Sequence, residues 1–189
     1  MGIPEMDAYA LSELLHGAKR GARPMALEEE MTGLFDQFRR PLFRYLLSLG
    51  ISAQDGEEII QEVFLALFQH LKSGKPRDNL RGWIFRVGHN QALKLRHRSS
   101  LRPIQAEDGL VETHPDPEAN PEEQALHGQR KRRLEAVIGA LAEQDRACLS
   151  LRAEGFRYRE IGEILGMSLG AVAASLERSL AKLRRADER

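Results

Sequence analysis

Apolar residues recur at helical spacing along most of the chain, and no segment alternates apolar and polar residues as a strand does. Between residues 31 and 50 the apolar positions, from Leu34 to Leu49, follow an i, i+3, i+4, i+7 pattern. Pro41 is expected to kink or restart this helix, and Gly50 is expected to end it. The pattern predicts an all-α protein.

Two more helices are predicted in the first half. Residues 52–73 carry an apolar face from Ile59 to Leu71, with Ser52 as the N-cap and carboxylates in the first turn, where they suit the helix dipole. After a break at Gly74 and Pro76, a third helix is predicted from Asn79, its expected cap, to about residue 99.

The second half predicts up to four short helices, at 134–141, 147–151, 161–165 and 172–183. The last two are typical of a helix-turn-helix, with Gly166 in the turn, where a positive φ is expected, and Ser168 as N-cap of the second helix. That second helix is expected to bury Val172, Leu176 and Leu183.

A proline-rich segment separates the two halves. Residues 101–124 hold four prolines and few large apolar groups, so they cannot bury enough surface to offset chain entropy. The predicted architecture is two small helical domains joined by a flexible, acidic, Pro-rich linker. The predicted ranges are an extension at 1–24, a first domain at 25–100, the linker at 101–124 and a second domain at 125–189.

Charge is segregated along the chain, although the formal net charge is zero. Cations dominate residues 73–100, where Asp78 is the single anion, and anions dominate residues 101–126, where Arg102 is the single cation. From residue 127 onward the chain is basic again. This order predicts two modules that meet polyanions, joined by an acidic connector.

The residues do not predict an enzyme. The sequence has no glycine-rich phosphate loop, no nucleophile elbow and no metal-ligand spacing of His and Cys, so no catalytic residue, metal or cofactor is expected. Cys148 lies in a helical apolar row and is expected to be a buried thiol, in keeping with a reducing cytosol. No apolar run reaches about 18 residues and no cationic leader is present, so a cytoplasmic location without membrane insertion is expected.

The third predicted helix suits nucleic acid. At 100° per residue, Arg86, Asn90, Lys94 and His97 form one stripe, with Trp83 one turn before Val87. Cations hold phosphates, and aromatic or amide groups engage unstacked bases. A stripe that is merely solvated is the plain alternative.

Four collinear segments resemble the extracytoplasmic-function (ECF) sigma factors of bacterial RNA polymerase, over residues 34–185 without the linker. "FDQFRRPLFRYLLSLG" resembles their first conserved helix, and "DGEEIIQEVFLALFQHL" resembles their polymerase-docking helix. "NLRGWIFRVGHNQALKLRHRS" resembles the promoter-melting segment, and the stretch from Leu141 to Arg185 resembles the −35-binding domain. The resemblance implies core polymerase, promoter DNA and an anti-sigma factor as partners.

The resemblance also implies three sets of binding residues. The set for core polymerase is Asp55, Glu58, Gln61 and Glu62. The set for −10 DNA is Lys75, Asn79, Arg81, Trp83, Arg86, Asn90 and Lys94. The set for −35 DNA is Arg157, Arg159, Ser168, Ala171, Ala174, Ser175, Arg178, Lys182 and Arg185.

The recognition helix departs most from the family pattern. Family members carry early cations where this chain has Ala, Ser and Glu177, so the electrostatic contribution is reduced while the apolar frame is kept. Arg178 is expected to reach a guanine edge, and Ala171 or Ala174 to touch thymine methyls. Two alternatives stay open: a sigma-like decoy that binds a regulator without productive DNA binding, and a free-standing helix-turn-helix repressor.

Overall fold

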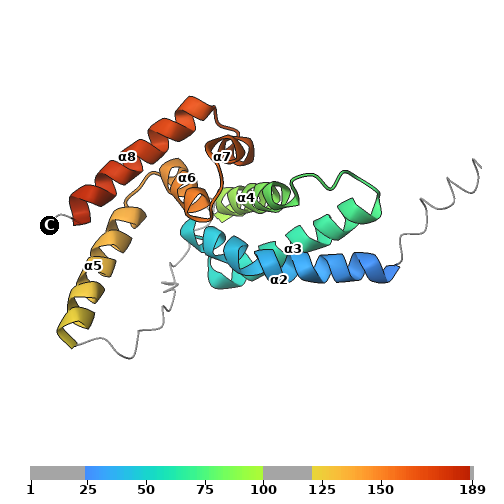
Figure 1. Ribbon diagram of the computed structural model, residues 1–189, viewed down its shortest axis with the longest axis horizontal. Coiled ribbons are helices and arrows are strands. Elements are labelled where there is room, and N and C mark those ends of the chain that lie inside the picture. The colour runs from blue at the N-terminus through green and yellow to red at the C-terminus, as the bar shows by residue number, and fades with distance from the viewer. Residues whose placement is uncertain (1–23, 100–120, 188–189) are drawn as a thin grey trace, which may run out of the picture.

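The computed structural model describes residues 24–99 and 121–187, and the described part is helical (Figure 1). The extension before residue 24 and the linker from 100 to 120 lie outside the described residues. The helices are α2 (Pro24–Ser48), α3 (Ala53–Lys72), α4 (Leu80–Ser99), α5 (Pro121–Gly139), α6 (Glu143–Ala153), α7 (Tyr158–Leu165) and α8 (Leu169–Asp187). Helix α5 begins at Pro121, inside the range predicted for the linker.

Helices α2, α3 and α4 form the first module around a shared apolar core. Its fully buried side chains include Leu42 of α2, Leu67 of α3 and Phe85 of α4. Pro41 lies inside α2, so the helix continues through the proline, and a restart there, the second of the two outcomes predicted for it, does not occur. The apolar face continues on both sides of Pro41, from Phe38 to Leu46, and packing of that face stabilises the helix through the proline.

Both caps predicted in the first module are confirmed. The Asp55 amide donates to Ser52 Oγ over 3.1 Å, and the Gly82 amide donates to Asn79 Oδ1 over 3.1 Å. Asn79 has φ 52°, a left-handed conformation that Asn tolerates better than most residues. A Cβ on Gly82 would lie 2.5 Å from the Asn79 side chain, so the cap requires glycine there.

Helices α5 to α8 form the second module, and α7 and α8 are its helix-turn-helix, with 105° between them. Gly166 has the expected positive φ, 67°, and the Ala171 amide donates to Ser168 Oγ over 3.2 Å. Gly162 permits the close approach of the turn, because a Cβ there would lie 2.7 Å from the carbonyl oxygen of Met167. Cys148 is buried, as predicted.

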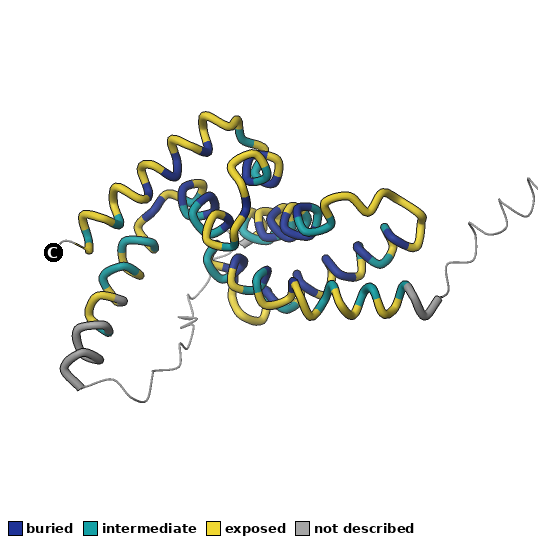
Figure 2. The backbone as a smooth tube through the Cα atoms, in the orientation of Figure 1, coloured by how far each residue is buried: buried dark blue, intermediate teal, exposed yellow. Residues whose placement is uncertain are grey.

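The two modules pack against each other, with α7 on α4 and α6 on α2 (Figure 1). Buried residues continue from one module into the other where these helices meet (Figure 2). The rings of Phe85 in α4 and Phe156 before α7 meet edge to face, with centroids 4.8 Å apart. The guanidinium of Arg81 lies 4.0 Å from the centroid of the Phe156 ring. We call this set the interdomain contact.

Candidate nucleic-acid and protein interfaces

The acidic face of α3 is exposed on the side opposite to its buried residues. Glu58, Gln61 and Glu62 are all exposed, while Ile60, Val63 and Leu67 of the same helix are fully buried. The fourth predicted docking residue, Asp55, is held in the helix cap, where its carboxylate accepts a 2.7 Å hydrogen bond from Ser52 Oγ.

An apolar side chain that sequence reasoning missed belongs to the same acidic face. Leu65 is 59% exposed and follows Gln61 and Glu62 by four and three residues, so it lies on their side of the helix. A row of carboxylates around an exposed leucine suits a basic protein surface with an apolar pocket.

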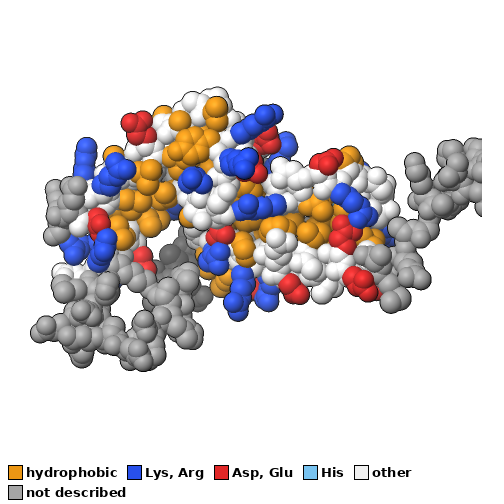
Figure 3. All heavy atoms as spheres, in the orientation of Figure 1, with side chains coloured by type: hydrophobic (Ala, Val, Ile, Leu, Met, Phe, Trp, Pro, Cys, Tyr) orange, Lys and Arg blue, Asp and Glu red, His pale blue; other side chains and the backbone are white. Residues whose placement is uncertain are grey.

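The basic stripe of α4 is present as predicted. Arg86, Asn90 and Lys94 are exposed, and Lys75 is exposed in the turn after α3. Arg86 also borders a hollow of about 630 Å³ whose other wall is formed by Tyr158, Arg159 and Leu169 of the helix-turn-helix. Arginines of both modules, Arg86 and Arg159, thus border one hollow. On the face of the molecule seen in Figure 3, Lys and Arg side chains are spread among acidic and hydrophobic ones.

Three other −10 candidates are held by structural contacts. Asn79 caps α4, and the Trp83 ring packs on His70 with centroids 5.1 Å apart. Arg81 donates to the backbone oxygen of Glu154 and covers the Phe156 ring, so its guanidinium belongs to the interdomain contact. In this arrangement the Arg81 guanidinium, which the resemblance assigned to −10 DNA, faces the second module.

The outer face of the helix-turn-helix carries most of the predicted −35 residues. The exposed ones are Arg157, Arg159, Ser168, Ala171, Ala174, Arg178, Lys182 and Arg185. Arg159 pairs with Glu163 over 3.2 Å, and Ser168 is the cap of α8. Between Leu169 and Glu177 this face is built from apolar and small residues, so the cations lie at its margins.

The assignment of Ser175 to the −35 DNA set is wrong, because this residue is fully buried and donates to Asp145 Oδ1 over 2.7 Å. Ser175 follows Val172 by three residues and precedes Ser179 by four. Both of these residues are buried, so helical geometry places Ser175 on the buried face of α8. It cannot touch a base from there.

Arg178 is anchored to the same oxygen. Its Nη2 donates to Asp145 Oδ1 over 2.8 Å, with the Arg178 side chain 58% exposed and that of Asp145 7% exposed. Burial alone would raise the pKa of Asp145, but the hydrogen bonds from Arg178 and Ser175 outweigh it and hold that pKa below its ordinary value. Sequence reasoning missed Asp145, since nothing in the local sequence pairs it with residues 30 and more positions away.

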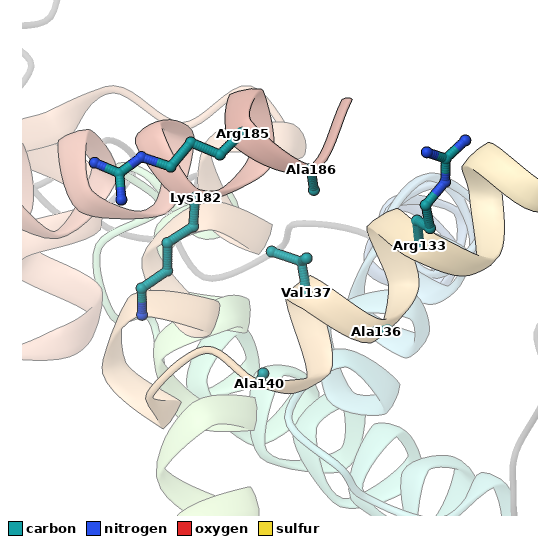
Figure 4. Close-up of a pocket in the computed structure, with 7 residues that line it drawn as sticks. All are labelled: Arg133, Ala136, Val137, Ala140, Lys182, Arg185 and Ala186. Carbon is teal, nitrogen blue, oxygen red and sulfur yellow. The ribbon is translucent and has the colours of Figure 1, made fainter. Parts of the chain in front are cut away.

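A groove of about 520 Å³ separates α5 from α8 (Figure 4). Ala136, Val137 and Ala140 of α5 and Ala186 of α8 line it, with Arg133, Lys182 and Arg185 at its edges. Lys182 and Arg185 thus border this largely apolar groove in addition to the outer face of α8.

Within residues 24–99 and 121–187, no group of three or more His, Cys, Asp or Glu could hold a metal ion. In the same ranges no single helix is long and apolar enough to cross a membrane. Only α7 and α8 taken together meet that length and composition test, as a bent pair whose Ile161 and Val172 are buried in the core.

Two family models match the chain: "Sigma-70 region 2" over residues 34–102 and "Sigma-70, region 4" over residues 131–183. The ECF RNA polymerase sigma factor ShbA of Streptomyces griseus is 31% identical over 132 residues, which cover 68% of this chain and 67% of that protein. The ECF RNA polymerase sigma factor SigE of Mycolicibacterium smegmatis is 30% identical over 145 residues, which cover 76% of this chain and 56% of that protein.

Solved structures share the fold. The sigma factor RpoE of Bartonella quintana, in complex with the anti-sigma factor NepR, matches with a TM-score of 0.60 and 21% identity over 84% of this chain and 96% of that one. CnrH in complex with the cytosolic domain of CnrY matches with a TM-score of 0.58 and 22% identity over 92% and 94%.

The two helical modules, one with an acidic and a basic face and one with a helix-turn-helix, define a sigma-type protein of transcription initiation. The chain belongs to the ECF sigma factors of the sigma-70 family. Sigma factors are DNA-binding proteins and not enzymes, in agreement with the sequence analysis.

Proposed function

We propose that this chain is an ECF sigma factor that binds core RNA polymerase in the cytoplasm and directs it to promoters. The observation that carries the proposal is the exposed acidic face of α3, in the same module as the basic stripe of α4. A row of carboxylates orients a cationic protein partner and speeds encounter with it. The basic stripe provides the cations that nucleic acid requires.

Charge reversal on α3 tests this function. Glu58→Lys with Glu62→Lys places two cations against a basic partner, and we expect at least about a tenfold loss of affinity for core polymerase and of promoter-dependent transcription. The matched control is Glu28→Lys with Glu29→Lys, an equal charge change at two exposed positions of α2. Equal behaviour of the two double variants in a pull-down at moderate salt would contradict docking through α3.

The decoy function is the second candidate, and the alanine-rich outer face of α8 favours it, because that face brings little phosphate attraction. The free-standing repressor is disfavoured by the acidic face of α3, for which a repressor has no use. Transcription with purified core polymerase on genomic fragments separates the candidates. A sigma factor yields discrete start sites, whereas a decoy yields none beyond those of the core enzyme alone.

Regulation by an anti-sigma factor is a further part of the proposal. RpoE and CnrH, which share this fold, were each solved with such a partner. In the present chain the packed modules already enclose Arg81 and place Arg86 beside α7. A regulator that holds the modules in this arrangement would keep part of the −10 set away from DNA.

A further inference from the structure

The carboxylate of Asp145 is a buried acidic group in the second module with two donors on one oxygen. Asp145 is the third residue of α6, and its side chain is only 7% exposed. Two donors from α8 converge on its Oδ1, Ser175 Oγ at 2.7 Å and Arg178 Nη2 at 2.8 Å. All three residues belong to the second module, so the network does not depend on how the two modules are arranged.

The guanidinium of Arg178 is held from one side only. Its contact with Asp145 uses one nitrogen, and the side chain remains 58% exposed. An arginine carries five N–H donors in a planar fork, so donors remain for a ligand. Ala171 and Ala174 precede it on the same face by seven and four residues, and their short side chains leave Arg178 as the long polar group there.

We propose that Asp145 is a positioning residue that fixes the Arg178 guanidinium for recognition of a guanine edge in the promoter. This inference rests on the proposed function in promoter binding. A free arginine loses rotamer freedom when it binds, and an anchored one has lost much of it beforehand. The O6 and N7 acceptors of guanine match two parallel N–H donors of such a fork.

The charge of Asp145 makes the proposal separable from a purely structural ion pair. A carboxylate close to DNA repels phosphates, so its removal strengthens binding to every sequence when electrostatics alone decides. Loss of orientation acts in the opposite direction and only at the base that Arg178 reads. Asp145→Asn is therefore expected to lower discrimination at one position while affinity for unrelated duplexes stays equal or rises.

The experiment uses the full chain bound to core polymerase and duplexes selected by the wild-type complex from a library randomised in the upstream element. Arg178→Ala is expected to lose about tenfold or more of the preference at one guanine position, and Asp145→Asn a large part of the same preference. Ser175→Ala is expected to have a smaller effect, because Arg178 still holds the carboxylate. Thermal melting of each variant reports whether the module remains folded.

Glu177→Gln is the matched control, since it removes an exposed anion next to Arg178 on the same helix. It is expected to raise affinity for all duplexes and to leave the guanine preference intact. A folded Asp145→Asn variant that keeps the full preference, while Arg178→Ala loses it, overturns the positioning role. Preference that survives Arg178→Ala overturns it as well but leaves the proposed function standing, whereas a wild-type complex without any sequence preference contradicts both.

Discussion

The packing of the two modules against each other, which we call the closed form, is best tested through Arg44. On α2, it makes a forked ion pair with Glu154 at the end of α6, with N–O distances of 3.0–3.1 Å. The Glu154 side chain is 14% exposed and that of Arg44 is 57% exposed. Glu154 also accepts from Arg81 through its backbone oxygen, so the α6–α7 turn is held by two arginines of the first module.

The magnitude follows from this geometry. Surface ion pairs contribute about 0.2–1 kcal/mol, and the solvent around Arg44 screens the pair accordingly. The forked geometry and the mostly buried carboxylate place it at the upper end, about 1 kcal/mol. Arg44→Ala should therefore lower the ratio of closed to open molecules about fivefold. Arg81→Ala removes a charged hydrogen bond and a cation–π contact, about 2 kcal/mol together, and should lower the ratio roughly thirtyfold.

Single-molecule energy transfer between dyes on Gln37→Cys in α2 and Ala181→Cys in α8 measures this ratio. Both positions are exposed, whereas the native Cys148 is fully buried and stays unlabelled. Arg40→Ala is the control, an exposed arginine one turn before Arg44. Unchanged transfer in both Arg44→Ala and Arg81→Ala would refute the idea that these contacts stabilise closure.

Binding of a single-stranded oligonucleotide to the free chain gives a second, independent test of the closed form. If closure removes Arg81 from the −10 surface, Arg44→Ala should bind more tightly, by up to about fivefold, because more molecules are open. Electrostatics alone predicts the reverse, since the variant has lost a cation. Arg81→Ala should open the chain without this gain, because it also removes a cation of the proposed −10 set. Weaker binding by Arg44→Ala in fluorescence anisotropy would exclude the linkage.

Three further predictions concern stability, each measured by urea or thermal unfolding. Asn79→Ala should lose about 2 kcal/mol, one part from the cap and one from the positive φ, and Asn79→Gly should lose less because only the cap is removed. Gly162→Ala should lose about 1–3 kcal/mol, because its Cβ would lie 2.7 Å from the Met167 carbonyl oxygen. Burial lowers the pKa of His89 from its ordinary 6.5, so the unfolded chain takes up the proton first and stability should fall as the pH drops below about 6.5. His89→Gln, which keeps a polar group beside Tyr45, should remove that part of the pH dependence.

Features of the fold that depend on neighbouring residues were predictable. Ser52, Asn79 and Ser168 cap the predicted helices, and Gly166 takes the predicted left-handed turn, because caps and turns are decided within about four residues. The burial of Cys148 followed equally well from its place in an apolar row.

Features that depend on distant partners were not predictable. Ser175 is a small polar residue on the buried face of α8, and its hydrogen-bond partner, Asp145, lies 30 residues away. Arg81 lay on a basic stretch in the sequence, but Phe156 and Glu154 of the other module hold it in the structure. Composition and periodicity do not determine which distant residues contact each other, because one sequence permits several packings of the same amphipathic helices.

The alanine-rich outer face of α8 is compatible with promoter recognition when affinity and specificity have separate sources. The early cations of the family pattern are missing between Leu169 and Glu177, so the isolated second module should bind DNA weakly. Core polymerase bound to α3 would hold that module near its site and raise its effective concentration, so tight binding by α8 itself is not required. One anchored arginine on a flat alanine face can then supply the discrimination, because a base contact carries sequence information and a phosphate contact does not. A chain with zero net charge and a closed free form would thus stay off DNA until the polymerase recruits it.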